Sequence, residues 1–212
     1  MSTEKPILTG HEDPTRVRWW NLPTIWSGGL AGAWLGGYWP GAESWERLTL
    51  LLLGASALHV AATTLEVRRH GRDPGGWALV GFGRWLLYVL ASAASSQPAL
   101  AAASGEGLLS ASYAVGSSVL ERADRRPGPP PRWPWLLVAL PMVVALPLFW
   151  LGRIVLGRAA PLGVRRVGAL AAGAALVDLS AVAAWAVPLP WLGTFAVLFA
   201  LALACQKLRP AA

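Results

Sequence analysis

The chain has 212 residues, of which 55% are hydrophobic and 14% are charged. An ordinary soluble domain carries about 25% charged residues, so this composition excludes one and favours the lipid bilayer as the solvent. The formal net charge of +7 does not indicate nucleic acid binding. The arginines stand in short segments beside apolar stretches, where membrane topology and anionic lipid explain them. The single cysteine, Cys205, excludes an intramolecular disulfide and a cysteine-rich metal site.

The predicted elements are apolar helices in a single domain. Residues 1–18 are polar, lack the pattern of a secretory signal, and form an N-terminal tail ahead of a helical domain at 19–207 and a short tail at 208–212. A spanning helix needs roughly 20 apolar residues and a barrel strand alternates with period two, so the apolar stretches predict helices. We expect an all-α, polytopic transmembrane bundle of about seven helices, at 20–39, 46–66, 77–97, 98–120, 133–152, 163–186 and 189–206.

The distribution of basic residues predicts an orientation. Clusters before the first stretch, after the second and after the fourth place those segments, and the N-terminus, on the cytoplasmic side of an inner membrane. Basic residues that follow the fifth and seventh stretches would then lie outside. Alternatively, Pro134, Pro141 and Pro147 break 133–152 into a re-entrant segment, which leaves six full spans and returns every cluster to the cytoplasm. Both arrangements stay open.

Four segments resemble a known family in the same order along the chain. "WNLPTIWSGGLAGAWLGG" (20–37) resembles the opening of the UbiA-type membrane prenyltransferases. Three later segments are similar to later helices of that superfamily: "GFGRWLLYVLASAAS" (81–95), "YAVGSSVLERADRR" (113–126) and "VRRVGALAAGAALVDLSAVAAW" (164–185). The resemblance is closest to the divergent EboC-like branch. It implies a membrane helix bundle from which one helical pair is missing near residues 60–76.

The same resemblance implies a site for Mg²⁺ and a prenyl diphosphate, because these enzymes hold the metal on aspartate-rich motifs. In this chain the first motif is not preserved. Its positions are occupied by Glu66, Val67, His70 and Pro74. A lone carboxylate holds a hard cation poorly. A reduced metal site would consist of Glu66, Asp73, Glu121 and Asp124.

Two alternatives remain for the charged residues of these loops. Glu121 and Asp124 lie at i and i+3 on one helical face, and a solvated pairing with Arg122 or Arg125 would explain them without a metal. The first loop is rich in positive charge and would attract phosphate directly. Its arginines are Arg68, Arg69 and Arg72.

Ionisable residues within an apolar span are costly and therefore suggest function. Arg84 and Asp178 could neutralise each other across the bundle, or Arg84 could hold an anionic or carbonyl group of a lipid-like ligand with Asp178 nearby. His59 lies among small residues in "GASALHVAA" and could be an axial ligand of haem or a pigment. Close helix packing around a hydrogen-bonded His59 is the alternative.

Three functions follow from these features. The first is a UbiA-like protein, non-catalytic or catalytically degenerate, that binds or handles a hydrophobic prenyl-type or lipid-like metabolite. The second is an active prenyltransferase with a reduced Mg²⁺ site. The third is a small integral subunit of a larger membrane complex that carries a pigment or haem. The sequence leaves open whether the chain is an enzyme.

Overall fold

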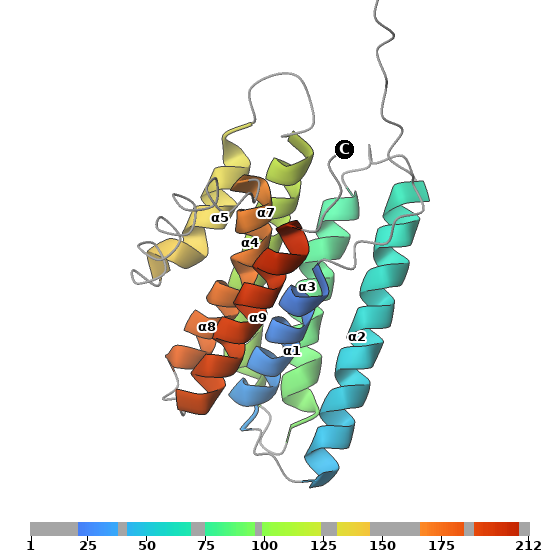
Figure 1. Ribbon diagram of the computed structural model, residues 1–212, viewed down its shortest axis with the longest axis vertical. Coiled ribbons are helices and arrows are strands. Elements are labelled where there is room, and N and C mark those ends of the chain that lie inside the picture. Colours follow the sequence, from blue (N-terminus) through green and yellow to red (C-terminus); the bar gives the residue numbers. More distant parts are fainter. Residues whose placement is uncertain are drawn as a thin grey trace, which may run out of the picture.

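The computed structural model describes residues 21–37, 42–68, 75–95, 99–123, 131–144, 166–184 and 189–207, and all regular structure within these ranges is helical (Figure 1). The expected all-α class is therefore confirmed. The helices are α1 (Leu22–Leu35), α2 (Ala42–Arg68), α3 (Gly75–Ala93), α4 (Leu100–Ala123), α5 (Trp133–Val144), α7 (Arg166–Ala172), α8 (Ala174–Ala183) and α9 (Leu189–Lys207).

Helix α1 lies in the middle of the bundle and contacts α2, α3, α4, α8 and α9. It begins with Pro23 in its first turn, where a missing N–H costs nothing. It ends at Gly36 and Gly37, and Gly37 has a φ of 70°, which is the left-handed conformation common after a helix end. Small residues fill most of its buried positions, so several neighbours approach its backbone closely.

The closest approach is between α1 and α3. A Cβ atom on Gly32 would lie 2.6 Å from the carbonyl oxygen of Tyr88, and one on Gly36 would lie 2.7 Å from that of Ser92. Gly28 stands one turn earlier on the same face of α1, opposite Arg84. The spacing of four residues aligns these glycines in one stripe, along which the two helices run in the same direction.

The helices alternate in direction, except around α5. Gly116 of α4 abuts Pro134 at the start of α5, and Tyr113 of α4 contacts Leu170 of α7. Helices α5 and α7 thus both begin near the carboxyl end of α4, and both run antiparallel to it (Figure 1). The choice between seven full spans and six spans with a re-entrant segment at 133–152 depends on residues 145–165, which lie outside the described ranges, so both arrangements stay predictions.

One end of the bundle collects the helix ends that carry basic residues, and we name it the basic end. It comprises the carboxyl ends of α2, α4 and α9 and the amino ends of α1, α3, α5 and α7 (Figure 1). The basic residues at these helix ends are Arg68, Arg132, Arg166 and Lys207. The opposite end carries Glu43, Glu46 and Arg47 in the first turns of α2, with one net negative charge.

The stretch expected as one helix at 163–186 is divided into α7 and α8 at Gly173. The hydroxyl of Tyr113 donates a hydrogen bond to the carbonyl oxygen of Leu170 at 2.7 Å. In an uninterrupted helix this carbonyl accepts from the N–H of residue 174. The Tyr113 hydroxyl also occupies the space of a Cβ on Gly173, at 2.3 Å. A glycine at this position therefore allows the tyrosine to insert.

In the described part of the chain one helix is long and apolar enough to cross a membrane, over Pro190–Lys207, and two shorter apolar stretches cover Ala78–Ala93 and Gly168–Ala183. Seven spanning helices were expected, but fewer meet this test of length and hydropathy, because some helices are too short and one carries several polar residues. Helix α1 has 14 residues, α5 has 12, and α4 contains Glu106 and Glu121 among several serines.

We predict that Gly32→Ala destabilises the bundle, because the added methyl group meets the backbone of α3 and forces α1 away. Overpacking of this kind costs about 1–3 kcal/mol. The measurement is the unfolding free energy in detergent. Gly54→Ala is the matched control, since a Cβ there meets nothing within 4 Å. Equal stability of the two variants would contradict the close packing of α1 against α3.

A second substitution tests the division between α7 and α8. Gly173→Ala should lower the thermal unfolding midpoint, because its methyl group would overlap the Tyr113 hydroxyl. Combining it with Tyr113→Phe removes the overlapping oxygen, so the double variant should recover part of the loss. A double variant whose loss equals the sum of the two single losses would argue against this contact.

Candidate functional site

An ion pair joins Arg84 of α3 to Asp178 of α8. Both side chains lie in the interior, where Arg84 is 5% exposed and Asp178 is 0% exposed. The predicted pairing of these two residues across the bundle is confirmed. They are 94 positions apart in the sequence, so the pair forms only when α3 and α8 pack together.

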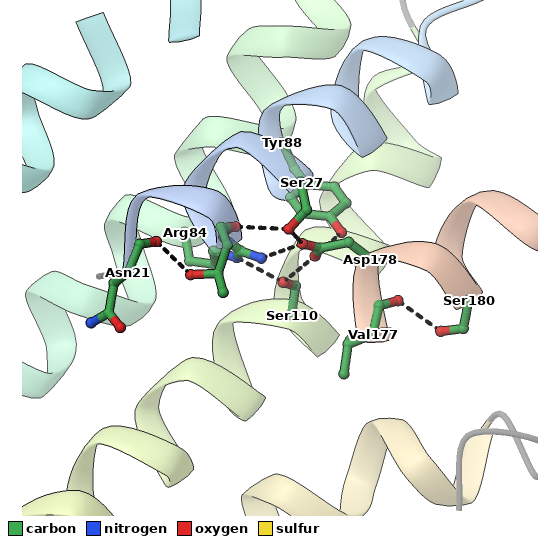
Figure 2. A network of polar contacts seen from close by, with 9 residues as sticks. Asn21, Ser27, Arg84, Tyr88, Ser110, Val177, Asp178 and Ser180 are labelled. Atoms are coloured by element: carbon green, nitrogen blue, oxygen red, sulfur yellow. Dashed lines mark hydrogen bonds and ion pairs between the residues drawn. The ribbon is translucent and has the colours of Figure 1, made fainter. Parts of the chain in front are cut away.

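The carboxylate of Asp178 accepts hydrogen bonds from three further helices (Figure 2). Its Oδ1 accepts from the hydroxyl of Tyr88 at 2.6 Å and from that of Ser110 at 2.9 Å. Its Oδ2 accepts from Ser27 at 2.5 Å and from Arg84. A carboxylate has about four lone-pair positions. All of them are used by α1, α3 and α4, which therefore converge on one residue of α8.

The guanidinium of Arg84 is also surrounded. Its Nε donates to Ser110 at 2.9 Å, its Nη1 to the carbonyl oxygen of Thr24, and its Nη2 to Asp178. The flat face of the group rests on Gly28, where a Cβ would lie 2.9 Å from Cζ. A side chain at this position would displace the guanidinium from its place against α1. Arg84 is 5% exposed and Asp178 neutralises it, so the structure shows it in the paired role, and its role toward a ligand stays a prediction.

A further set of hydrogen bonds connects this network to the basic end. The hydroxyl of Thr24 donates to the carbonyl oxygen of Asn21 at 2.7 Å, in the first turn of α1. The side-chain oxygen of Asn21 accepts from Nε2 of Gln206 at 3.0 Å, in the last turn of α9. These contacts tie the amino end of α1 to the carboxyl end of α9, one residue before Lys207.

The other predicted site residues are not brought together by the described contacts. Arg68 is the last residue of α2, and Glu66 lies in its last turn, but their side chains are outside the described set. His59 lies partly buried on the same helix, and its role as an axial ligand stays a prediction. The residues that fall wholly outside the described ranges are Arg69, Arg72, Asp73 and Asp124.

Glu121 differs from one of its two expected environments. It lies near the carboxyl end of α4 and is 8% exposed. Glu121 is therefore not solvated as expected, whereas its pairing with Arg122 or Arg125 stays a prediction. The helical period places Glu121 on the buried face of α4 together with Ser110 and Ser117.

Sequence reasoning omitted four residues that belong to the interior or its edge. Ser27, Tyr88 and Ser110 bind Asp178, and only the spacing of Tyr88, four residues after Arg84, signals a shared helical face. Serine in an apolar helix is too common to be singled out. Glu106 is the fourth, and it was recognisable, because it is an ionisable residue inside the apolar stretch 98–120.

Comparisons with known proteins add no assignment: no family model, no curated protein and no solved structure matches the chain. The site is therefore interpreted from its own geometry.

We predict that Asp178→Asn and Arg84→Met each lower the unfolding free energy by about 3–5 kcal/mol, because each leaves the other charge buried without its partner. The double variant removes both charges. Its loss should be smaller than the sum of the two single losses by at least about 1–2 kcal/mol. Chemical unfolding in detergent measures this coupling.

Glu46→Gln, an exposed change at the opposite end of the bundle, is the control and should stay within about 0.5 kcal/mol of the wild type. Additive losses in the double variant would contradict a direct structural pairing of Arg84 with Asp178.

Proposed function

We propose that this chain is a polytopic integral membrane protein of six traversing helical segments and one re-entrant segment. Its role is to bind a hydrophobic prenyl-type or lipid-like metabolite without diphosphate chemistry. The observation that carries the membrane placement is the distribution of polarity. The interior holds an ion pair with its hydroxyl partners, and the outer surface holds leucines.

The outer surface supports this placement in detail. Leu50 and Leu58 of α2 and Leu136 of α5 are 69%, 68% and 73% exposed. Single exposed leucines are normal in soluble proteins, but here they recur on α2, α3, α4, α5 and α9 around a charged centre. Lipid solvates such a surface, and the buried pair satisfies the charges that lipid cannot.

Helix α9 adds a second argument. Only 22% of its apolar window Pro190–Lys207 is buried, so it differs from the core helix of a soluble protein, which is mostly buried. The length of α9, 19 residues, corresponds to about 28 Å, close to the thickness of the hydrocarbon layer. The short helix α1 is enclosed by its neighbours, so it need not match that thickness.

The charges at the two ends support an orientation. With α5 in a re-entrant segment, Arg68, Arg132, Arg166 and Lys207 share the basic end. The positive-inside rule then assigns this end, and the N-terminus, to the cytoplasmic face of an inner membrane. No basic cluster is left on the outer side, which removes the conflict that seven full spans would create.

The ligand class rests on the resemblance to UbiA-type proteins together with the missing aspartate motif. The motif positions hold Glu66, Val67, His70 and Pro74, which do not form a magnesium site for a diphosphate. Arg84, which could have held an anionic group, is engaged by Asp178. A bundle of this kind retains an apolar environment for a lipid-like molecule and lacks the means to activate a diphosphate.

The test is mass spectrometry combined with an absorption spectrum on protein gently extracted from its native membrane. We predict a prenyl-type or similar apolar metabolite that co-purifies in near-stoichiometric amount, without visible absorbance. An unrelated membrane protein extracted in parallel corrects for bulk lipid. Prenyl transfer that depends on Mg²⁺ and is lost in Glu66→Gln would contradict the non-catalytic role. A stoichiometric haem or pigment that is lost in His59→Ala would contradict the ligand class.

A further inference from the structure

Gln206, in the last turn of α9, is a buried side chain whose hydrogen bonding is incomplete. It is 6% exposed, and its Nε2 donates to Oδ1 of Asn21 at 3.0 Å. Its Oε1 is also buried, and in the described part of the chain it has no hydrogen-bond partner. Burial of an unsatisfied amide oxygen is costly, and an amide does not relieve that cost by taking up a proton. The oxygen therefore calls for a donor that no described residue supplies.

Asn21, immediately before α1, directs its side chain to α9 and not to its own helix. Asparagine at this position commonly accepts a hydrogen bond from the first turn of the helix. Here its ψ is −5°, its side chain makes no capping bond, and its Oδ1 is taken by Gln206. The first turn of α1 contains no acidic residue either. The positive end of the helix dipole thus has no carboxylate or capping side chain from α1 itself.

The charge at this end of α1 favours an anion. Lys207, the last residue of α9, is exposed and follows Gln206 directly. A helix amino end attracts negative charge, and an ammonium group beside it adds to that attraction. A cation is disfavoured for the same reason. A water molecule could donate to Gln206, but it would leave this positive charge without a counterion.

The site is open on one side and held firmly on the other. Asn21 and Leu22 are partly exposed, whereas Pro23 and Thr24 are buried. The hydroxyl of Thr24 donates to the carbonyl oxygen of Asn21 at 2.7 Å, and the carbonyl oxygen of Thr24 accepts from Arg84. The first turn of α1 is therefore fixed to the central ion pair. Groups held in this way bind a ligand without a further cost of ordering.

We propose that the amino end of α1 and the amide of Gln206 together bind a phosphate ester that carries a hydroxyl group. The phosphate oxygens accept hydrogen bonds from the first turn of α1 and from Nδ2 of Asn21, and Lys207 adds its charge. The hydroxyl group donates to Oε1 of Gln206. A glycerol-type phospholipid presents this combination at the membrane surface. The inference rests on the proposed function, and it gives the lipid-like ligand of that proposal its polar group.

The experiment compares two short-chain lipids on the full chain in detergent. Dioctanoyl phosphatidylglycerol and dioctanoyl phosphatidylmethanol carry the same charge, but only the first has hydroxyl groups. The wild type should bind phosphatidylglycerol about five- to tenfold more tightly, as one added hydrogen bond to a buried acceptor allows. In Gln206→Leu the two dissociation constants should be equal. Equal dissociation constants in the wild type would overturn the inference, and that comparison stands even if Gln206→Leu does not fold.

Three further variants test the charge at this site. Asn21→Asp places a carboxylate at the amino end of α1, where it suits the helix and so preserves the fold. It should weaken both lipids by about tenfold or more, because a like charge now opposes the phosphate. Lys207→Gln should weaken both lipids by about threefold. Arg132→Gln removes an exposed cation of the basic end on α5 and is the matched control. An equal loss in Arg132→Gln would indicate general attraction and overturn the site.

The source of the phosphate ester is tested with glycerophosphoglycerol, the same headgroup without acyl chains. We expect it to displace the lipid only in large excess. Displacement at equal concentration would assign the site to a soluble phosphate ester, which supports the site and contradicts the lipid-like ligand of the proposed function. If neither molecule binds saturably and Gln206→Leu is as stable as the wild type, the amide needs no ligand, and the inference is overturned.

Discussion

The ion pair between Arg84 and Asp178 is the interaction on which the bundle depends. One carboxylate on α8 accepts hydrogen bonds from Ser27 of α1, from Arg84 and Tyr88 of α3, and from Ser110 of α4. Four helices far apart in the sequence must meet at one point for this to happen. Burying either charge alone would cost more than the packing around it returns, so the pair selects one arrangement of these helices.

The space that the Arg84–Asp178 pair requires explains other features of the chain. The guanidinium needs a flat space against α1, and Gly28 supplies it. Gly32 and Gly36 extend the same face and let the backbones of α1 and α3 run close together. Helix α1 is thereby enclosed, and its short length becomes tolerable. Polar groups gather inside and apolar groups are left outside, which is the distribution on which the proposed membrane placement rests.

Much of this fold could be predicted from the sequence, because apolar length and composition determine where membrane-type helices form. The described helices fall within or close to the seven expected stretches, and the pairing of Arg84 with Asp178 followed from the cost of isolated charges. Apolar length does not determine how each helix is rotated about its axis. The sequence therefore did not indicate the hydroxyl partners of Asp178 or the burial of Glu121.

Two local features could not be predicted from the sequence: the division of the helix at Gly173 and the packing of α5. The division at Gly173 depends on a tyrosine from α4, which no pattern within 163–186 reveals. The start of α5 packs against Gly116 of α4, and no pattern within 133–152 reveals this contact. The remaining loop predictions, including those for Arg69, Arg72, Asp73 and Asp124, concern residues outside the described ranges.

The most direct measurement of the central claim is the side of the membrane on which single cysteines react. In a Cys205→Ala background, Arg132→Cys, Lys207→Cys and Glu46→Cys would be treated with a membrane-impermeant maleimide in oriented vesicles. We predict that positions 132 and 207 react from one side and position 46 from the other. Reaction of positions 132 and 207 from opposite sides would contradict the topology, and reaction of all three from one side would contradict a membrane-spanning bundle.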